Sequence, residues 1–219
     1  MISGKNIDKT MNILKKISSA YKPPVLERFA YDKKDPYWVL IPCLLSLRAR
    51  DETTAVVSEK LFAAAPAPAE IMKLPRPKLE KIIYKSGFYR NKAKAIHETT
   101  KMLIEKYSGK VPDSLEELLK LPGVGRKTAN LVVTAAFNKP GICVDTHVHR
   151  ITNRWGYVDT KNADKTEMRL REILPKKYWI KINYHLVLFG QNICLPVSPY
   201  CSRCPLRGMC PQKNVRTPR

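Results

Sequence analysis

Acidic residues are scarce in this 219-residue sequence, which has 19 Asp and Glu against 40 Lys and Arg and a formal net charge of +21. A positive field of that size indicates a polyanionic partner, and we expect nucleic acid rather than only a solvated basic surface. Core-forming residues are not scarce, because 44% of the chain is hydrophobic. That fraction excludes wholesale disorder and suffices for one ordinary domain or two small ones.

Long apolar segments are also missing. The longest apolar run, residues 37–47, is too short to cross a bilayer, and the first ten residues lack the apolar core of a signal peptide. These absences predict a soluble intracellular protein with no membrane partner. Because that compartment is reducing, we expect the six cysteines to be thiols or metal ligands rather than disulfides.

Alternating strand patterns, internal repeats and low-complexity stretches are absent, and helical spacing takes their place. Residues 7–17 carry apolar side chains at three- and four-residue steps, which indicates an amphipathic helix. Residues 36–48 are apolar almost all round, as is typical of a helix at the centre of a core, and Pro42 is expected to kink it or to set its first turn. Further helices are predicted from Asp51 through Phe62 and over 67–74, 77–85, 90–107, 145–155, 163–174 and 177–193. The predicted fold class is all-α.

Three predicted helix boundaries depend on single residues. Asp51 is expected to cap the helix that follows it. Gly87 suits the position just after a helix end. Asp113 and Glu116 have the spacing of a capping box.

A glycine-containing turn lies in LPGVGRKTANLVVTAAF, residues 121–137. Gly123, Val124 and Gly125 predict a tight connection between two helices, since glycine permits positive φ angles and lets a phosphate approach the backbone. The N–H groups at the start of the second helix point outward, and the helix dipole adds positive potential there. An ordinary helix connection is the alternative, but the net charge favours a DNA-binding helix-hairpin-helix over about 113–137.

Lys127 and Asp145 are the candidate catalytic residues. Lys127 lies just inside the second hairpin helix beside Arg126, where an ammonium ion is disfavoured and a free amine can act as a nucleophile. It could instead only contact a phosphate. Asp145, in VDTHVHR, is either a plain helix cap or a carboxylate that stabilises positive charge developing on a sugar. The residues alone leave both choices open.

Four of the cysteines are clustered near the C-terminus with the spacing C-x6-C-x2-C-x5-C. They are Cys194, Cys201, Cys204 and Cys210. Four thiolates so close together can bind one metal centre, either a zinc ion or a [4Fe–4S] cluster. Zinc sites more often use two C-x2-C pairs or Cys–His mixtures, so the wider gaps favour the cluster. Cys43 and Cys143 lie among apolar residues and are expected in the core.

LPGVGRKTAN, VDTHVHR and the four-cysteine segment occur together, in this order, in the endonuclease III family of DNA glycosylases, which the chain resembles from about residue 10 to residue 212. The resemblance implies a two-lobed, all-α helix-hairpin-helix glycosylase fold. One lobe is a six-helix domain over 27–138. The other combines 1–26 with 139–219 and carries the cluster loop, 194–210.

The resemblance also implies the chemistry. Lys127 attacks the sugar C1′, Asp145 assists, and the four clustered cysteines hold a [4Fe–4S] cluster whose loop binds DNA through Arg203 and Arg207. The expected enzyme is a bifunctional DNA glycosylase that removes oxidised pyrimidines and an AP lyase that cleaves 3′ to the abasic site through a Schiff base. Its partner would be double-stranded DNA with damaged bases or abasic sites. We expect a cytoplasmic, nucleoid-associated monomer.

Two positions depart from the family pattern. Arg48 stands where members often carry glutamine and Phe88 where leucine is common. The resemblance places both where side chains fill the gap left by a flipped base, and arginine and phenylalanine can wedge into a base stack. Two alternatives to the lyase are a non-catalytic zinc-containing DNA-binding module and a mismatch-specific glycosylase. Sister groups with mismatch specificity lack the lysine at position 127.

Overall fold

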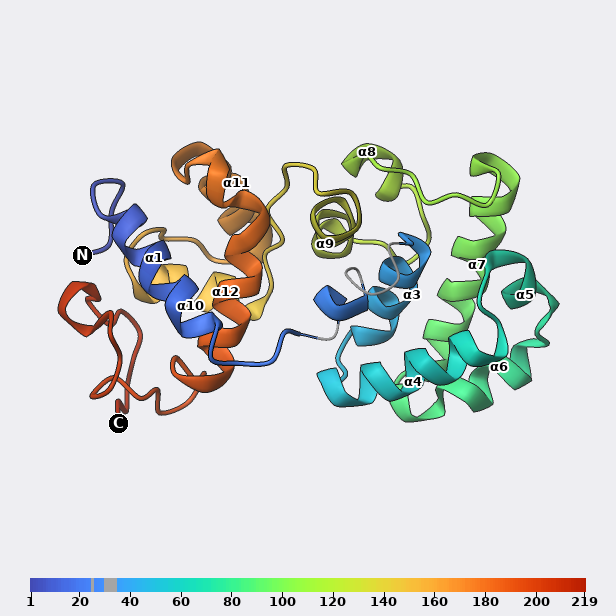
Figure 1. The fold of residues 1–219 in the computed structure, drawn as a ribbon, viewed down its shortest axis with the longest axis horizontal. Helices are drawn as coiled ribbons and strands as arrows, with labels where there is room; N and C mark the ends of the chain where they lie inside the picture. Colours follow the sequence, from blue (N-terminus) through green and yellow to red (C-terminus); the bar gives the residue numbers. More distant parts are fainter. Residues whose placement is uncertain (25, 30–34) are drawn as a thin grey trace. The chain divides into compact units, whose positions relative to one another are not determined.

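The computed structural model describes residues 1–24, 26–29 and 35–219, and every regular element in these ranges is helical (Figure 1). The prediction of an all-α fold is therefore confirmed. The α-helices are α1 (Ile7–Ser18), α3 (Tyr37–Ser46), α4 (Asp51–Ala64), α5 (Pro68–Lys73), α6 (Arg76–Ile83), α7 (Tyr89–Tyr107), α8 (Leu115–Leu118), α9 (Arg126–Phe137), α10 (Thr146–Arg154), α11 (Ala163–Ile173) and α12 (Trp179–Asn192). The described residues also form 3-10 turns: η1 (Tyr84–Ser86) between α6 and α7, η2 (Lys176–Tyr178) before α12, and η3 (Arg207–Met209) after α12. Among the described helices, none is both long and apolar enough to cross a membrane.

The chain divides into two compact units. One unit combines residues 1–24 with 140–219, and the other is continuous over 25–139. The expected domain bounds, 27–138 and 1–26 with 139–219, stay a prediction. The expectation that both units serve as DNA-binding lobes stays a prediction.

Helix α3 forms the centre of the continuous unit. Eight of its ten residues are buried, and it packs against α4, α7 and α9. Pro42 lies inside the helix and does not set its first turn, so of its two expected roles only that of a kink remains. The ring of Trp38 stacks on Phe62 of α4 with centroids 3.8 Å apart, and the Tyr37 hydroxyl hydrogen-bonds to Thr100 of α7 at 2.8 Å. The apolar run thus forms the core helix that its composition predicts.

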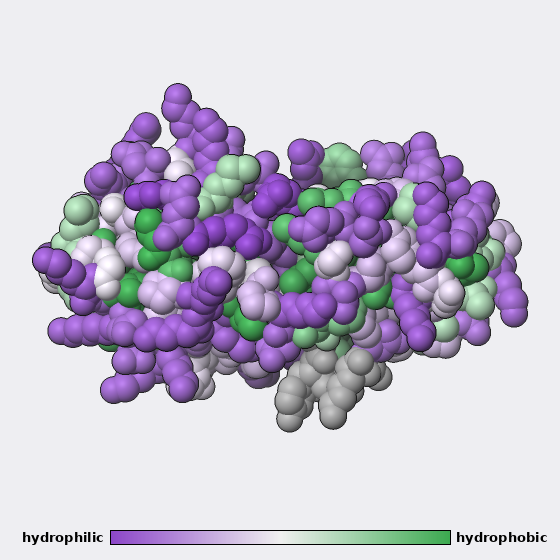
Figure 2. Space-filling model, turned by 90° about the horizontal axis from the view of Figure 1, so that it is seen from above, coloured by the Kyte–Doolittle hydropathy of each residue, from purple (hydrophilic) through white to green (hydrophobic). Residues whose placement is uncertain are grey.

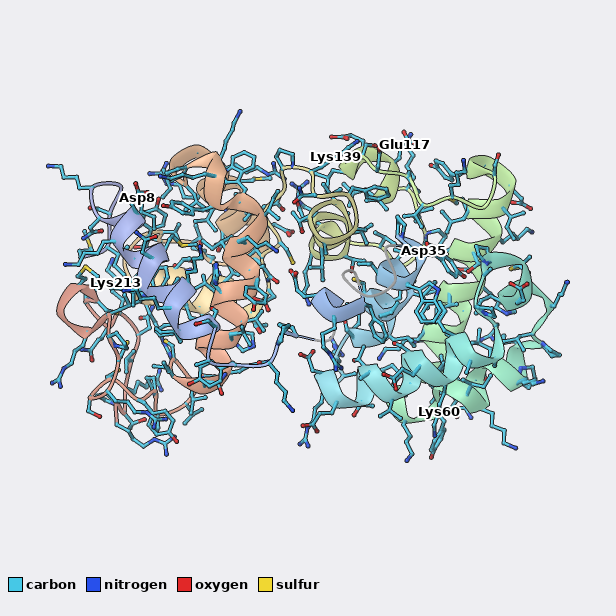
Figure 3. The ribbon with its side chains drawn as sticks, viewed as in Figure 1. Asp8, Asp35, Lys60, Glu117, Lys139 and Lys213 are labelled. Carbon is cyan, nitrogen blue, oxygen red and sulfur yellow. The ribbon has the colours of Figure 1, made fainter. Side chains whose placement is uncertain are left out.

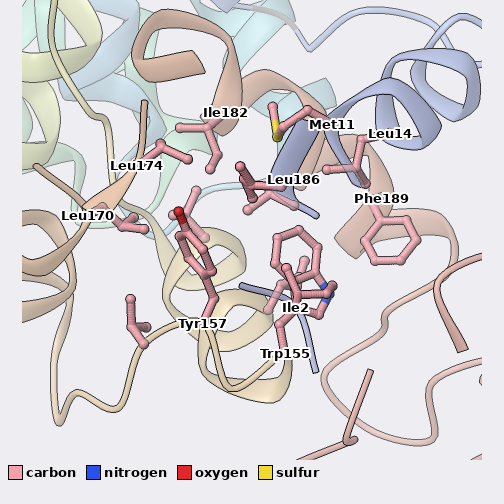
Figure 4. Close-up of a cluster of buried hydrophobic side chains, with 14 of the residues drawn as sticks. Ile2, Met11, Leu14, Trp155, Tyr157, Leu170, Leu174, Ile182, Leu186 and Phe189 are labelled. Atoms are coloured by element: carbon pink, nitrogen blue, oxygen red, sulfur yellow. The ribbon is translucent and has the colours of Figure 1, made fainter. Parts of the chain in front are cut away.

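The other unit is held together by segments from both ends of the chain. Met11 and Leu14 of α1 pack with Leu186 and Phe189 of α12 in one hydrophobic cluster (Figure 4). At the start of α1, Asp8 (labelled in Figure 3) accepts hydrogen bonds from Lys177 at 3.0 Å and from Tyr178 at 2.7 Å. These contacts fasten the N-terminal helix to residues about 170 positions later.

Helix α12 approaches α10 closely at Gly190. A Cβ atom added at this glycine would overlap the His147 ring and meet the Arg150 guanidinium at 3.0 Å. The Arg150 guanidinium in turn donates to the Cys194 carbonyl at 2.9 Å. The absence of a side chain at Gly190 therefore lets α10 and α12 pack together.

Several predicted helix boundaries are wrong by one to a few residues. Asp51 is the first residue of α4 and makes no capping hydrogen bond, because the N-cap position is Arg50. In α8 the cap is Ser114, whose hydroxyl accepts from the Glu117 N–H, while Asp113 forms an ion pair with Lys139. A capping side chain accepts a hydrogen bond from an N–H two or three residues later in the chain. A shift of one residue therefore changes which side-chain oxygen can cap the helix.

The last predicted helix is also shorter than expected. Residues 176–178 form the η2 turn, and α12 starts at Trp179. Gly87 has φ +60° and is the C-cap of the η1 turn, whereas α6 itself ends earlier, with Tyr84 as its C-cap. Hydrophilic side chains cover much of the molecular face in Figure 2, as the charge of the chain implies.

Candidate active site

The predicted hairpin connects α8 to α9, and its two glycines have different conformations. Gly123 has φ +76°, and a Cβ atom added there would lie 3.0 Å from the Cβ of Ala95. Gly125 is the N-cap of α9 with φ −92°, and an added Cβ would meet nothing within 4 Å. Val124 between them is buried, with 6% of its surface exposed. The protein itself therefore requires glycine at 123, whereas the space beside Gly125 is open.

Lys127 lies in the first turn of α9, and its side chain is exposed. Burial raises the pKa of the Cys43 thiol in α3 to about 12, and the positive charge of Lys127 acts in the opposite direction. The lysine is thus within electrostatic range of the end of the core helix. It lies at the hairpin, in the first turn of α9, as an exposed residue.

Asp145 is the N-cap of α10. Its Oδ1 accepts hydrogen bonds from the His147 N–H at 2.9 Å and the Val148 N–H at 2.8 Å. The capping role expected from the sequence is confirmed, and its catalytic role stays a prediction. Both bonds fall on one carboxylate oxygen, and the side chain is only partly buried.

Arg48 and Phe88, 40 positions apart in the sequence, come together on the surface of the continuous unit. The Arg48 guanidinium carbon lies 5.4 Å from the centroid of the Phe88 ring. Both residues have positive φ, +55° for Arg48 and +47° for Phe88, and both side chains are exposed. Together with Gly123 they line a hollow of about 440 Å³. The structure thus joins three residues that the sequence suggested separately as DNA contacts.

Lys92, which sequence reasoning missed, lies beneath this pair. Only 5% of the surface of Lys92 is exposed, and its ammonium donates to the carbonyl oxygens of Leu45 and Ser86. Desolvation lowers the pKa of Lys92 to about 8. No local sequence signal distinguishes this lysine from the exposed lysines of the same helix.

The four clustered cysteines line a single cavity, formed by the end of α12, residues 194–212 and part of α10. All four are free thiols. Burial raises the pKa of Cys204 to about 11 and also raises those of Cys201 and Cys210. Among the described residues, no group of three or more His, Cys, Asp or Glu side chains is arranged to hold a single metal ion.

Arg154, at the end of α10, organises the cysteine segment and was also missed. Its guanidinium donates to the Leu195 carbonyl at 2.6 Å and the Pro196 carbonyl at 2.7 Å, and it lies 3.4 Å from the Cys194 sulfur. Its own carbonyl accepts from the Lys213 N–H at 3.1 Å. One buried arginine therefore connects both ends of the cysteine segment.

Arg203 and Arg207, the predicted DNA contacts of the cluster loop, are both exposed. The Arg203 guanidinium lies over the Tyr200 ring, 3.8 Å from its centroid, while Arg207 borders the cysteine-lined cavity. Their role in DNA binding stays a prediction. The same holds for Arg126, which is half-buried at the start of α9.

Comparisons with known proteins agree with this arrangement. The family described as "HhH-GPD superfamily base excision DNA repair protein" matches residues 41–176. The hairpin, the helical fold and this match define the class as helix-hairpin-helix base excision DNA repair proteins.

Relatives narrow the class further. Endonuclease III of Thermotoga maritima is 50% identical over 188 residues, 85% of this chain and 88% of that protein. Endonuclease III of Bacillus subtilis is 39% identical over 183 residues, 83% of this chain and 84% of that one. A solved endonuclease III trapped as a covalent intermediate with DNA has a TM-score of 0.87 and 36% identity, and the match covers 97% of each chain. The chain belongs to the endonuclease III family.

Proposed function

We propose that this protein is a bifunctional DNA glycosylase and AP lyase of base excision repair, which removes oxidised pyrimidines from double-stranded DNA and cuts at abasic sites. Family membership supports the reaction class. The observation that carries the lyase activity is the exposed Lys127 in the first turn of the second hairpin helix. A lysine nucleophile implies a lyase, because only an amine can form a Schiff base with the sugar.

The chemistry requires an extruded nucleotide, since a stacked base hides its glycosidic bond. The Lys127 amine attacks C1′, the C1′–N bond breaks, and its electron pair leaves with the base, which takes up a proton. The amine loses a proton, the sugar ring opens at the C1′–O4′ bond, and an iminium ion forms at C1′. The iminium acidifies the C2′ hydrogen. Loss of that proton expels the 3′ phosphate by β-elimination, and water then releases the lysine.

Asp145 is proposed to assist by stabilising the positive charge that develops on the sugar. Its capping bonds support this role, because two N–H donors on Oδ1 hold the side chain in one orientation. We expect Asp145→Asn to bind DNA and to react far more slowly. Cleavage at the wild-type rate would reduce the residue to a helix cap.

The hairpin is proposed to hold a DNA phosphate at the N-terminus of α9, where backbone N–H groups and the helix dipole favour an anion. The open space beside Gly125 supports this position. Such a contact sets the register of the enzyme on DNA without reading sequence. Affinity should fall steeply with salt, since several phosphates are neutralised.

The four cysteines are proposed to hold a [4Fe–4S] cluster. The spacing C-x6-C-x2-C-x5-C favours a cluster, because zinc sites more often use two C-x2-C pairs or Cys–His mixtures. A cluster fills the space between its ligands, which suits four thiols around one cavity. When bound, the cluster would hold the loop together rather than break bonds. Purified protein should be yellow-brown with matching iron and sulfide, whereas a colourless zinc protein would contradict this assignment.

Covalent trapping tests the lyase proposal. Incubating the protein with a duplex that contains an oxidised pyrimidine, and then adding borohydride, should reduce the iminium to a stable protein–DNA adduct. Lys127→Ala should form none. Lys60→Ala, an exposed lysine on α4 (Figure 3), removes the same charge and should form the adduct normally. Absence of an adduct with wild-type protein on any oxidised pyrimidine or abasic site would refute the proposal.

A further inference from the structure

The two candidate wedge residues are carried by separate loops. Arg48 lies two residues beyond the end of α3, and Phe88 lies two residues beyond the η1 turn. Neither loop is long, yet each places its residue at positive φ, a conformation that is uncommon for side chains of this size. The surrounding structure must therefore hold both loops in place.

Lys92 supplies a direct connection between them. Its ammonium donates to the carbonyl of Leu45, in the last turn of α3, at 2.7 Å, and to the carbonyl of Ser86, the last residue of η1. These carbonyls precede Arg48 by three residues and Phe88 by two. A buried cation between two carbonyls fixes their separation, because hydrogen bonds to a charged donor are short and directional.

A second contact joins the side chains themselves. The Arg48 guanidinium lies 5.4 Å from the Phe88 ring centroid, within the range of a cation–π interaction. The Arg48 and Phe88 side chains are exposed above, whereas Lys92 is buried below. Both residues and Lys92 line the same hollow with Gly123 of the hairpin.

We propose that Arg48 and Phe88 act as one preassembled wedge, and that Lys92 is the positioning residue that sets the distance between their loops. This inference rests on the proposed function and concerns how a base is extruded. Inserting two joined side chains into a stack fills the vacated space with less loss of conformational freedom than ordering two independent loops. Lys92 touches neither DNA nor the reacting atoms in this proposal.

The wedge is needed only where a nucleotide has to leave a stacked duplex, which at an abasic site means turning the bare sugar out of the helix. An abasic site in single-stranded DNA reaches the Lys127 amine without unstacking a duplex, so its reaction should not depend on the wedge. The ratio of borohydride trapping rates on duplex and single-stranded abasic DNA therefore isolates extrusion from chemistry. This ratio does not depend on what fraction of a variant is folded.

The first test is Lys92→Met, which keeps the length of the side chain and removes the donors. We expect its duplex trapping rate to fall about tenfold and its single-strand rate to stay within about twofold of wild type, a coupling typical of neighbouring residues. The matched control is Lys101→Met, on the exposed face of α7, which removes the same charge and should leave both rates unchanged. An unchanged ratio in Lys92→Met, or equal losses on both substrates, would overturn the proposal.

A second test does not require the Lys92 variant to fold. Arg48→Ala, Phe88→Ala and the double variant form a cycle on the duplex substrate. If the two residues act as one wedge, the double variant should be no more than about twofold slower than the slower single variant. Multiplicative losses would show two independent residues and overturn the proposal. If wild-type protein traps neither substrate, the lyase function fails instead, so the two failures are distinguishable.

Discussion

Substitution of each hairpin glycine by alanine should separate folding from DNA binding. In Gly123→Ala the new Cβ would sit at φ +76°, where an L-residue loses about 1–2 kcal/mol, and it would press on the Ala95 Cβ at 3.0 Å. Reduced freedom of the unfolded chain returns about 0.4–1 kcal/mol. These two terms leave a net loss of about 1 kcal/mol, and the contact with Ala95 adds to it, so Tm should fall by roughly 4 °C in a protein of this size.

Gly125→Ala should behave in the opposite way. Its φ of −92° suits alanine, and no atom of the protein lies within 4 Å of the added Cβ. The weaker N-cap and the gain from the unfolded chain nearly cancel, so the free energy of unfolding should change by less than about 0.5 kcal/mol. A methyl group at this helix end would, however, stand where the phosphate approaches. Loss of one charge-assisted hydrogen bond should weaken DNA binding about tenfold or more.

Thermal unfolding and fluorescence anisotropy with an abasic-site duplex measure the two effects. Gly123→Ala and Gly125→Ala serve as controls for each other, since both add the same methyl group and the two positions lie within three residues. If Gly125→Ala binds DNA like wild type, the phosphate is not held at the start of α9. If Gly123→Ala is as stable as wild type, the turn does not need its left-handed conformation.

Three further changes should act in the unit formed by residues 1–24 and 140–219. Gly190→Ala should lower stability by about 1–2 kcal/mol in thermal unfolding, because the added methyl group overpacks the contact with α10; unchanged stability would mean that α12 shifts freely. Burial lowers the pKa of His185 to about 4, with Lys181 and Lys15 adding to the effect. Since the unfolded histidine titrates near 6.5, this residue should contribute stability that is complete above pH 6.5 and is lost as the pH falls toward 4; His185→Gln should flatten the Tm profile in that window, and an identical profile would count against the assignment. Arg154→Lys should keep the charge but lose the paired carbonyl bonds, so visible absorbance of the proposed cluster should bleach faster in air, with equal bleaching contradicting the organising role of Arg154.

Short-range patterns in the sequence were sufficient for the helical class and for the hairpin turn and helix cap of the candidate site. Residues 36–48 indicated a core helix because they are apolar on every side, and α3 is buried accordingly. The hairpin turn and the Asp145 cap could be predicted because turn and cap chemistry involves residues within three or four positions of one another. The catalytic roles of Lys127 and Asp145 rest on the family resemblance and stay predictions. Where the exact residue depended on reach, as with Asp51 and Asp113, the prediction missed by one position.

Only the tertiary structure decided the contacts between distant segments. In the sequence, Lys92 cannot be distinguished from an exposed helical lysine. The fold places the Leu45 carbonyl, 47 positions earlier in the chain, beside its ammonium. The Arg154 guanidinium donates to carbonyls that lie 41 and 42 positions later in the sequence. Helices α10 and α12 pack together through their close approach at Gly190. Local sequence patterns depend on residues a few positions apart. Which groups a buried charge contacts, and where a glycine is needed for close packing, depends instead on how the helices pack in space.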